Sequence, residues 1–549
     1  MKKFKPKSYE EFLEKYVPPN PSLFNFAFDV VDEKAKSNPE ATAMIHVDDN
    51  GSSKTYSYGF FSRESNKLAN VLAEHGIKKG DRVMLILYRR VEFWVAMLAL
   101  NKIGAVSIPS PSQLTPKDIV YRVESADVKG IISEDSVITR IDAARPECPG
   151  IFLYMAVGQS CPEGWVSYET LCKKATDAFH KPKDYPCDDD PLLIFFSSGT
   201  SGKQKMVEHT NRYPLGHYTT AVYWHDLDPG DIHLTVADTG WGKAVWGKFY
   251  GQWMADAIVF VYDFRGKFDP RKLLEVISAH KVTTLCVPPT IYRFMVMEDL
   301  KSFDLSALRH CTTAGELLNA SVFEEWLEKT GLSLYEGYGQ TETTVQILTL
   351  PFMKPKPGSM GKPAPGWDIV LLDQNDQICP PGVEGEICVK IHPKRPLGFF
   401  TGYIGEANLT AEVTRNGLYH TGDKAWLDED GYFWFMGRVD DLIKSSGYRI
   451  GPFEVESALV SHKAVIEAAV TGVPDPVRGQ SVKATVVLAP GYKPSESLTK
   501  ELQEHVRAET APYKYPRIIE YVDALPKTIN GKIRRVEIRE RDEKKYKNN

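Results

Sequence analysis

Short apolar runs alternate with helical patterns over the first two-thirds of the chain. Residues 82–87 predict a buried strand, residues 91–103 a helix, and residues 104–109 the next strand. Residues 127–133 and 282–287 repeat the apolar strand pattern. Strands that alternate with helices are typical of parallel sheets with helices on both faces. The pattern therefore predicts an α/β fold for this part of the chain.

From about Gly358 the pattern changes to short strands that are interrupted by glycine and proline. Residues 367–373 and 385–390 are examples, and they indicate a small antiparallel, β-barrel-like subdomain. This subdomain would complete a large N-terminal domain, which otherwise consists of two parallel or mixed sheets with helices.

After Arg438 the chain returns to mixed patterning, with a helix at 453–460 and a strand at 484–488. We expect a domain boundary here, with the N-terminal domain at 1–439 and a small mobile α+β domain at 440–549. Asp440 would then be the hinge between the two domains.

Composition and charge exclude several classes of protein. The 549 residues contain 67 Lys and Arg against 72 Asp and Glu, a net charge of −5, which does not favour nucleic acid as a partner. The eight cysteines form no C-x-x-C pair, so neither a zinc site nor a disulfide framework is indicated. No apolar run approaches the ~18 residues of a membrane span, and the basic start lacks the apolar run of a secretory signal. We therefore expect a cytoplasmic protein without integral membrane association.

Residues 197–205 (Ser-Ser-Gly-Thr-Ser-Gly-Lys-Gln-Lys) have the composition of a phosphate-binding loop. Gly199 and Gly202 let successive backbone N–H groups turn toward one anion. The hydroxyls of the loop add donors, and Lys203 or Lys205 can offset phosphate charge. A flexible Gly/Ser surface connection is the alternative, but the apolar run that precedes the loop favours an anion site.

Further motifs follow this loop in a familiar order. They are Ala314-Gly-Glu316, Tyr338-Gly-Gln-Thr-Glu342, Tyr419-His-Thr-Gly-Asp423, Gly437-Arg-Val-Asp-Asp-Leu-Ile-Lys444, Ser446-Gly-Tyr-Arg449 and Leu525-Pro-Lys-Thr-Ile-Asn-Gly-Lys532. Together with the loop, this set resembles the adenylate-forming superfamily of acyl-CoA synthetases, peptide-synthetase adenylation domains and luciferases. The resemblance implies an AMP-forming ligase that uses ATP, Mg²⁺ and, as a co-substrate, coenzyme A.

The resemblance also assigns roles to single residues. Lys532, Thr200 and Glu342 would be catalytic, and Glu342 and Thr200 would hold Mg²⁺, which prefers carboxylates and substrate phosphates. The nucleotide would contact Ser197, Ser198, Gly199, Thr200, Ser201, Gly202, Lys205, Gly315, Glu316, Glu336, Gly337, Tyr338, Gly339, Gln340, Thr341, Asp423, Arg438 and Lys532. Taken alone, Glu342 would more often be a solvated acid at a helix start, Asp423 a turn residue and Lys532 a surface lysine.

Several segments, among them residues 238–241, 429–438 and 445–456, look like those of the medium-chain acyl-CoA synthetases. This resemblance implies a role in fatty acid metabolism. By analogy, coenzyme A would contact Gln113, Ser446, Gly447, Tyr448, Arg449, Arg478 and Tyr515. Trp241 and Thr341 would contact the acyl substrate. The aromatic residues from Trp241 to Trp253 recur at near-helical spacing and could instead be ordinary core. Gln204 departs from the family, in which proline is usual, and it would loosen the loop.

The implied reaction joins a carboxylic acid to coenzyme A through an acyl-adenylate. The aromatic bulk near Trp241 favours a short- or medium-chain, branched or aryl acid. A stand-alone adenylation enzyme that loads a carrier protein is the alternative. A nucleotide-binding scaffold without turnover would need neither Glu342 nor Lys532. The sequence leaves the oligomeric state open, and a dimer is one option.

Overall fold

The computed structural model describes residues 3–198, 204–446, 448–527 and 533–546, and the statements below concern these residues. The first of two large sheets has nine strands: β1 (Thr42–Asp48), β2 (Ser53–Ser57), β10 (Ile232–Thr235), β11 (Ile258–Asp263), β12 (Thr284–Cys286), β13 (His310–Ala314), β14 (Leu334–Gly339), β15 (Val345–Leu348) and β16 (Lys362–Pro363). Their order is β16-β15-β14-β13-β12-β10-β11-β1-β2. The six inner strands from β14 to β1 pair in parallel, and the pairs at both edges are antiparallel.

The second large sheet has eight strands in the order β19-β9-β8-β4-β3-β5-β6-β7. They are β3 (Arg82–Ile86), β4 (Val106–Pro109), β5 (Val128–Glu134), β6 (Leu153–Val157), β7 (Val166–Ser167), β8 (Pro191–Ser198), β9 (Gln204–Thr210) and β19 (Gly402–Tyr403). Its strands from β8 to β7 are parallel, whereas β8, β9 and β19 form an antiparallel edge. The α/β prediction is confirmed.

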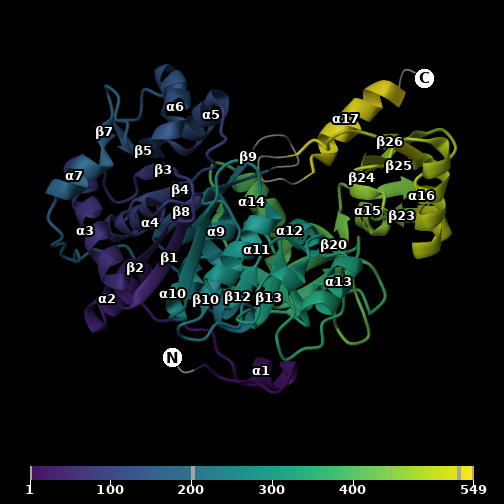
Figure 1. The fold of residues 1–549 in the computed structure, drawn as a ribbon, viewed down its shortest axis with the longest axis horizontal. Coiled ribbons are helices and arrows are strands. Elements are labelled where there is room, and N and C mark those ends of the chain that lie inside the picture. The colour runs from purple at the N-terminus through teal and green to yellow at the C-terminus, as the bar shows by residue number, and fades with distance from the viewer. Residues whose placement is uncertain (1–2, 199–203, 447, 528–532, 547–549) are drawn as a thin grey trace.

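Helices surround both sheets (Figure 1). They are α1 (Tyr9–Lys15), α2 (Glu33–Ser37), α3 (Tyr58–Glu74), α4 (Val91–Ile103), α5 (Pro116–Ala126), α6 (Ile138–Ala144), α7 (Tyr168–Lys174), α8 (Tyr213–Thr219), α9 (Gly242–Gly247), α10 (Tyr250–Met254), α11 (Pro270–Ala279), α12 (Pro289–Val296), α13 (Ala320–Thr330) and α14 (Ala407–Val413). Helix α4 matches its predicted bounds because Gly104 ends it in a left-handed conformation with φ 76°. None of the described helices has the length and apolar character of a bilayer span.

The predicted antiparallel subdomain is a four-stranded sheet. Its strands are β17 (Ile369–Leu372), β18 (Gly385–Lys390), β20 (Leu418–Leu427) and β21 (Phe433–Arg438), and they pair antiparallel in the order β17-β18-β20-β21. The apolar side chains of this sheet pack around Ile387 and Phe433, which are both buried. Both β20 and β21 carry motif residues, so this subdomain contributes directly to the candidate site.

A smaller α+β domain follows, drawn in yellow-green on the right of Figure 1. It consists of β22 (Ile443–Ser445), β23 (Tyr448–Ile450), α15 (Pro452–Ser461), β24 (Val465–Asp475), β25 (Gly479–Leu488), α16 (Glu496–Glu509), β26 (Ile518–Tyr521) and α17 (Arg535–Tyr546). Its five strands have the order β23-β22-β25-β24, with β26 parallel to β25. The domain has a hydrophobic core of its own around Val455, Val470 and Leu502.

Two ion pairs fix α17 to the smaller domain and to the segment that enters it. Lys483 on β25 is fully buried, and its Nζ lies 2.5 Å from Asp542 Oδ1 on α17. Arg539 on α17 pairs with Asp441, directly after the predicted hinge. A buried charge that loses its partner is costly, so these pairs define the position of α17.

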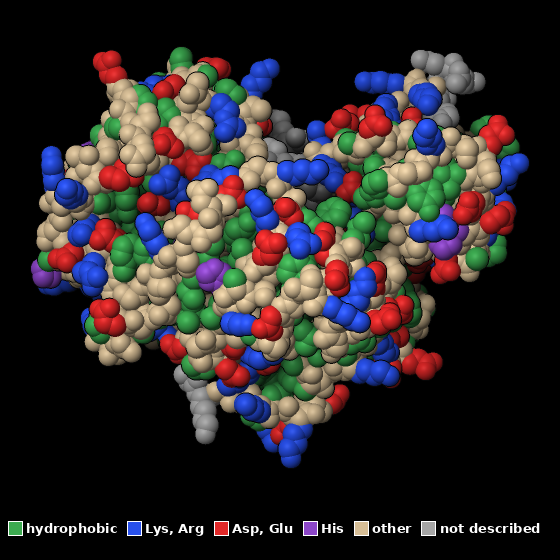
Figure 2. Space-filling view, in the orientation of Figure 1, with side chains coloured by type: hydrophobic (Ala, Val, Ile, Leu, Met, Phe, Trp, Pro, Cys, Tyr) green, Lys and Arg blue, Asp and Glu red, His purple; other side chains and the backbone are tan. Residues whose placement is uncertain are grey.

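Contacts between the N-terminal body and the smaller domain are local. Asn319 at the start of α13 donates from Nδ2 to Ser457 O on α15, at 3.0 Å. A Cβ atom at Gly451 would lie 2.3 Å from Met436 O, so the chain passes close to β21 where it enters the smaller domain. Figure 2 shows a notch between the two parts, with acidic and basic side chains interspersed over the visible face.

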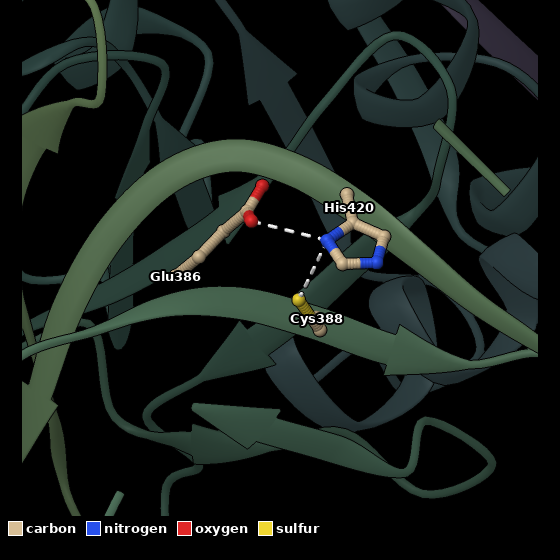
Figure 3. Close-up of side chains that lie close together, drawn as sticks. All are labelled: Glu386, Cys388 and His420. Atoms are coloured by element: carbon tan, nitrogen blue, oxygen red, sulfur yellow. Dashed lines mark hydrogen bonds and ion pairs between the residues drawn. The ribbon is translucent and has the colours of Figure 1, made fainter. Parts of the chain in front are cut away.

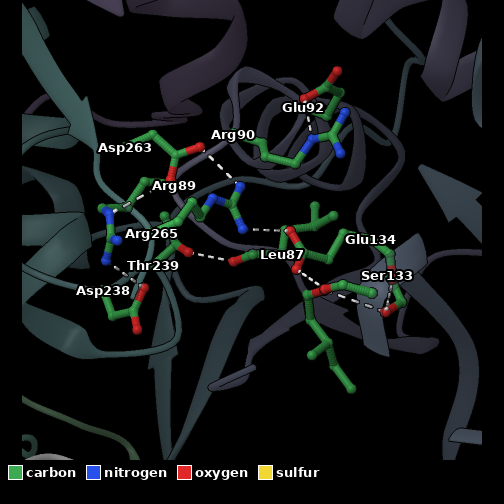
Figure 4. Close-up of polar contacts among 12 residues, drawn as sticks. Leu87, Arg89, Arg90, Glu92, Ser133, Glu134, Asp238, Thr239, Asp263 and Arg265 are labelled. Atoms are coloured by element: carbon green, nitrogen blue, oxygen red, sulfur yellow. Dashed lines mark hydrogen bonds and ion pairs between the residues drawn. The ribbon is translucent and has the colours of Figure 1, made fainter. Parts of the chain in front are cut away.

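Charged side chains join the carboxyl ends of the two large sheets (Figure 4). Arg89, which follows β3, is 7% exposed and lies 3.2 Å from Asp238 and 3.7 Å from Asp263. Arg265 lies 2.8 Å from Asp263 and 3.3 Å from Glu134 at the end of β5. This network holds the segment after β10 against the second sheet.

Candidate active site

The predicted phosphate loop connects two paired strands. Ser197 on β8 is opposite Lys205 on β9, and Ser198 is opposite Gln204. Gly199, Thr200, Ser201, Gly202 and Lys203 lie outside the described residues, so their proposed contacts stay predictions. The structure thus describes both ends of the loop.

Both residues at the end of the loop have contacts with the surrounding body. Tyr121 donates from its hydroxyl to Gln204 O at 2.9 Å. Lys205 Nζ lies 4.9 Å from the centre of the Tyr403 ring, which is within the range of a cation–π contact. The expected loosening by Gln204 concerns the loop itself and stays a prediction.

The motif Tyr338–Glu342 covers the end of β14 and the start of the turn that leads to β15. Glu342 is only 8% exposed, and its Oε1 accepts a hydrogen bond from Tyr403 at 2.8 Å. Buried in a turn, this side chain is not the solvated acid at a helix start that the sequence left open as an alternative. Thr341 accepts from His209 Nε2 at 2.8 Å through its backbone carbonyl, which ties the turn to β9.

Several motif residues contact the carboxylate of Asp423 on β20. Its Oδ2 accepts from the Tyr338 hydroxyl at 2.5 Å and from Gln340 Nε2 at 2.7 Å. Arg438 pairs with Asp423 across the ladder, and its Nη1 lies 3.9 Å from Oδ1. Burial and the Asp423 carboxylate raise the pKa of Tyr338 well above its usual value. The structure therefore brings these four predicted nucleotide contacts together.

Sequence reasoning missed two tyrosines in this site. Tyr419 donates to Gln340 Oε1 at 2.7 Å, and Tyr403 donates to Glu342. Tyr419 begins the motif that ends at Asp423, so it could have been found from that motif. Tyr403 lies 61 positions from its partner, and its sequence neighbourhood carries no comparable signal.

Gly315 and Glu316 directly follow β13, and Glu336 and Gly337 lie within β14. Glu316 accepts from the Thr290 hydroxyl at 2.6 Å. Glu336 is 4% exposed, and its Oε1 accepts from Leu318 N at 3.4 Å. Burial raises the pKa of Glu336 to about 8, so this carboxyl group is largely protonated at neutral pH.

Replacing Glu336 with glutamine should therefore change how stability depends on pH. The pKa rises from 4.5 to about 8 on folding, so the wild-type chain loses stability as the pH rises from about 4.5 to about 8. When the pKa of a group differs by one between the folded and unfolded states, the free energy of unfolding changes by about 1.4 kcal/mol across the pH range between the two values. We expect Glu336→Gln to be more stable than wild type at pH 9, by up to a few kcal/mol, and to match it at pH 4. Urea unfolding at both pH values measures the free energy of unfolding of each protein. The expectation would be contradicted if this free energy changed with pH in Glu336→Gln as it does in wild type, or if the exposed control Glu316→Gln gained the same stability.

The aromatic segment after Trp241 is not one continuous helix. It forms α9 and α10, which are separated at Lys248 and Phe249. Phe249, Tyr250 and Trp253 are buried and pack in the main core, so the core alternative is confirmed for these three residues.

Trp241 has a different environment from the buried aromatic residues. It is half-buried and lies at the start of α9, three positions after Asp238. Thr239 donates to Leu87 O and so fixes this segment to β3 (Figure 4). Lys243 donates to Ala314 O at 3.1 Å, and burial lowers the pKa of Lys248 to about 7.

Most of the predicted coenzyme A contacts lie together on the smaller domain. The Ser446 N–H donates to Arg478 O at 2.9 Å, next to the pairing of β22 with β25. The Tyr448 ring is 51% exposed and stacks on Tyr513, with ring centres 4.1 Å apart. Gly447, between Ser446 and Tyr448, lies outside the described residues.

The remaining coenzyme A candidates are more dispersed. The Tyr515 ring lies 3.8 Å from the Arg507 guanidinium, and Arg449 lies on β23. Gln113 lies on the N-terminal body instead, where its Nε2 donates to Asp238 at 3.4 Å. The candidates therefore belong to two separate domains.

Lys532 lies outside the described residues, but both flanking segments are described. Lys527 and Ile533 form an isolated β-bridge. Arg535, at the start of α17, makes a charge-assisted contact of 2.6 Å with Glu456 on α15. The described segments on either side, at Lys527 and from Ile533 on, thus belong to the smaller domain.

Comparison with known proteins identifies related chains over nearly the full length. The model of the AMP-binding enzyme family matches residues 31–404, and the model of the AMP-binding enzyme C-terminal domain matches residues 454–532. The mouse protein "Acyl-coenzyme A synthetase ACSM3, mitochondrial" is 43% identical over 544 residues, which cover 97% of this chain and 93% of that protein. The human protein "Acyl-coenzyme A synthetase ACSM5, mitochondrial" is 44% identical over 531 residues, which cover 95% of this chain and 91% of that protein.

Solved structures agree with this result. The anthranilate CoA ligase AuaEII in complex with anthranoyl-AMP has a TM-score of 0.87 and 28% identity, and covers 95% of this chain and 98% of that chain. A benzoate CoA ligase from Burkholderia xenovorans LB400 has a TM-score of 0.81 and 27% identity, and the match covers 94% of this chain and 100% of that chain. The fold predicted from the sequence is therefore also that of these ligases.

The predicted cytoplasmic location was wrong. Relatives with 42–44% identity are described as mitochondrial and not as cytoplasmic. The features behind the prediction were a missing secretory signal, a missing membrane span and cysteines whose spacing indicates no disulfide framework. None of these features distinguishes the cytoplasm from the interior of a mitochondrion.

Proposed function

Because this chain belongs to the AMP-binding enzyme family and is an AMP-forming acyl-CoA synthetase, we propose roles for its residues and a class for its acid substrate. The acid would be short- or medium-chain, branched or aryl. The observation that carries the proposed roles is the cluster around Asp423, which joins Tyr338, Gln340 and Arg438 beside the buried Glu342.

The Asp423 carboxylate suits the two hydroxyls of a ribose. A carboxylate accepts hydrogen bonds at both oxygens, and Tyr338 and Gln340 both donate to Oδ2 of this one. Arg438 adds positive charge at the same edge for the ribose or a phosphate. Tyr338 would lie against adenine, and the loop from Ser197 to Lys205 would surround the phosphates.

The residues present fit a magnesium ion. Glu342 offers a hard carboxylate ligand, and among the described residues this carboxylate accepts one hydrogen bond, from the neutral Tyr403 hydroxyl. Thr200, the second proposed ligand, lies outside the described residues. When bound, Mg²⁺ would neutralise phosphate charge.

In the first half-reaction an oxygen of the acid attacks the α-phosphorus of ATP. A P–O bond forms to the acid, the bond to pyrophosphate breaks, and the acyl-adenylate remains. The protein contributes position and positive charge rather than a covalent intermediate. Lys532 would bring its ammonium group to the carboxylate and the α-phosphate from the smaller domain.

In the second half-reaction the sulfur of coenzyme A attacks the acyl carbonyl. The thiol loses its proton, a thioester bond forms and AMP leaves. We propose that the smaller domain turns about Asp440 between the steps, withdraws Lys532 and brings Ser446 and Gly447 to the acyl-adenylate. Gln113 and Arg478 lie on different domains, which supports a coenzyme A site that forms only after this movement.

Substituting proline for Asp440 tests the hinge. Proline fixes φ near −65°, so we expect Asp440→Pro to retain one half-reaction and to lower overall turnover by about tenfold or more. Pyrophosphate exchange and thioester formation from supplied acyl-adenylate should be measured separately. Asp440→Ala, which removes the 3.2 Å contact with Arg438 Nε but leaves the backbone free, is the matched control. Normal rates in the proline variant would rule out a hinge at this residue.

The proposed substrate class rests on the partly buried Trp241 and on the neighbouring aromatic core. Two of the similar structures are ligases of anthranilate and benzoate, which are aryl acids. A panel of C2 to C10, branched and aryl acids, assayed for AMP formation that depends on coenzyme A, tests the class. Exclusive activity with linear acids longer than C10 would overturn it.

Transfer of the acyl group to a carrier protein is the alternative second step. Arg478 beside the Ser446 turn favours a nucleotide thiol, because its guanidinium suits a 3′-phosphate. An enzyme that forms acyl-adenylate but whose AMP release is unaffected by coenzyme A would support the carrier protein instead.

A further inference from the structure

Three side chains with metal-binding atoms lie together on the small antiparallel subdomain (Figure 3). Cys388 on β18 is directly opposite His420 on β20, and Glu386 lies two positions before Cys388. Because alternate residues of a strand share a face, all three side chains project from one face. His420 Nδ1 lies 3.0 Å from Glu386 Oε2 and 3.4 Å from Cys388 Sγ.

These distances suit a bound ion. The three atoms lie within 4.8 Å of one another. Tetrahedral zinc with bonds of about 2.0–2.3 Å holds its ligand atoms roughly 3.2–3.8 Å apart. The thiol, imidazole and carboxylate would therefore need to move only slightly to surround one ion.

Burial and charge also favour a metal ion at this place. Cys388 is fully buried and His420 is 5% exposed, whereas the Glu386 side chain is 21% exposed and gives access from solvent. One carboxylate and one thiolate would balance the two charges of a divalent ion.

We propose that Glu386, Cys388 and His420 form a binding site for Zn²⁺, separate from the magnesium site proposed at Glu342. The ligands would be one Glu386 oxygen, the Cys388 thiolate and His420 Nδ1, with water in the fourth position. On binding, the thiol releases its proton to solvent, and the neutral imidazole carries its proton on Nε2. Zn²⁺ is the ion that suits one sulfur, one nitrogen and one oxygen ligand.

The site lies on the opposite side of β20 from the Asp423 cluster. His420 alternates with Tyr419 and Thr421 along the strand, and Gln340 donates to Thr421 O at 2.9 Å. The Gly422 N–H, next to Asp423, donates to Glu386 Oε1 at 2.9 Å. Bound zinc would therefore stabilise the Tyr419–Asp423 segment through contacts on the face of β20 opposite the Asp423 cluster.

Cobalt binding to the full-length protein tests the site without any assay of activity. After treatment with a chelator, wild type should bind one equivalent of Co²⁺ and show a thiolate-to-cobalt absorption band that Zn²⁺ abolishes. Cys388→Ser should lose the band and bind Zn²⁺ at least tenfold more weakly, and His420→Gln should also weaken binding. Cys379→Ser, which changes another buried cysteine of this subdomain, is the matched control and should behave as wild type.

Thermal unfolding separates loss of binding from loss of fold. Zn²⁺ should raise the midpoint of wild type and Cys379→Ser but not that of Cys388→Ser, while all three melt cooperatively without metal. Absence of the band in wild type at saturating Co²⁺ would overturn the proposal. An equal band and affinity in folded Cys388→Ser would overturn it as well.

Discussion

Replacing Lys532 with alanine should lower acyl-adenylate formation by about 10²–10³-fold or more. Thioester formation from supplied acyl-adenylate should remain near the wild-type rate. The reason is that the ammonium group would act only while negative charge develops on the α-phosphate. Pyrophosphate exchange measures the first step, and coenzyme A consumption measures the second.

Lys527→Ala is the matched control for this experiment. Lys527 lies five positions earlier, and its Nζ contacts Glu467 on β24 at 2.6 Å, so it is held within the smaller domain. It should keep both rates. Equal losses in the two half-reactions of Lys532→Ala would contradict the proposed division of labour.

Replacing Glu342 with glutamine should lower the rate of adenylation by about 10²-fold or more and raise the Mg²⁺ concentration needed for half-maximal rate. Glutamine keeps the size of the side chain and can still accept from Tyr403, so the buried turn should stay folded. What disappears is the negative charge that would bind the metal ion. Titration of pyrophosphate exchange with Mg²⁺ measures both effects.

Tyr403→Phe separates the charge of Glu342 from its orientation. It removes the 2.8 Å hydrogen bond but leaves the carboxylate, so we expect a loss of about tenfold or less. If Glu342→Gln retained the magnesium dependence of wild type, this residue would not hold the ion.

The parts of the fold that the sequence predicted best are those with strong local signals. Helix α4 and strand β18 have the predicted bounds because a glycine stop and an apolar run define them locally. Asp423 and three motif residues around it meet in space although β14 and β20 lie far apart in the chain. Their meeting followed from a family resemblance and not from the pattern of either strand.

Features that depend on tertiary contacts could not be predicted. The hydrogen bond between Tyr403 and Glu342 joins two segments whose local patterns are unrelated. The aromatic spacing after Trp241 fits one helix, but the structure interrupts it at Lys248, whose Nζ donates to Ala237 O at 2.6 Å. The proposed zinc site at Cys388 could not be predicted from the cysteine spacing, because its ligands come from two strands that pair only in the folded protein.

The ion pair between Arg539 and Asp441 links the helix after Lys532 to the residue after the proposed hinge. Because the ion pair joins α17 to the residue after the hinge, a small change of a backbone torsion near Asp440 would move Lys532 over a larger distance. The relative population of the two domain orientations would depend on charges far from the nucleotide. Substitutions on the surface of α17 could therefore speed one half-reaction at the expense of the other while the chemistry of both stays unchanged.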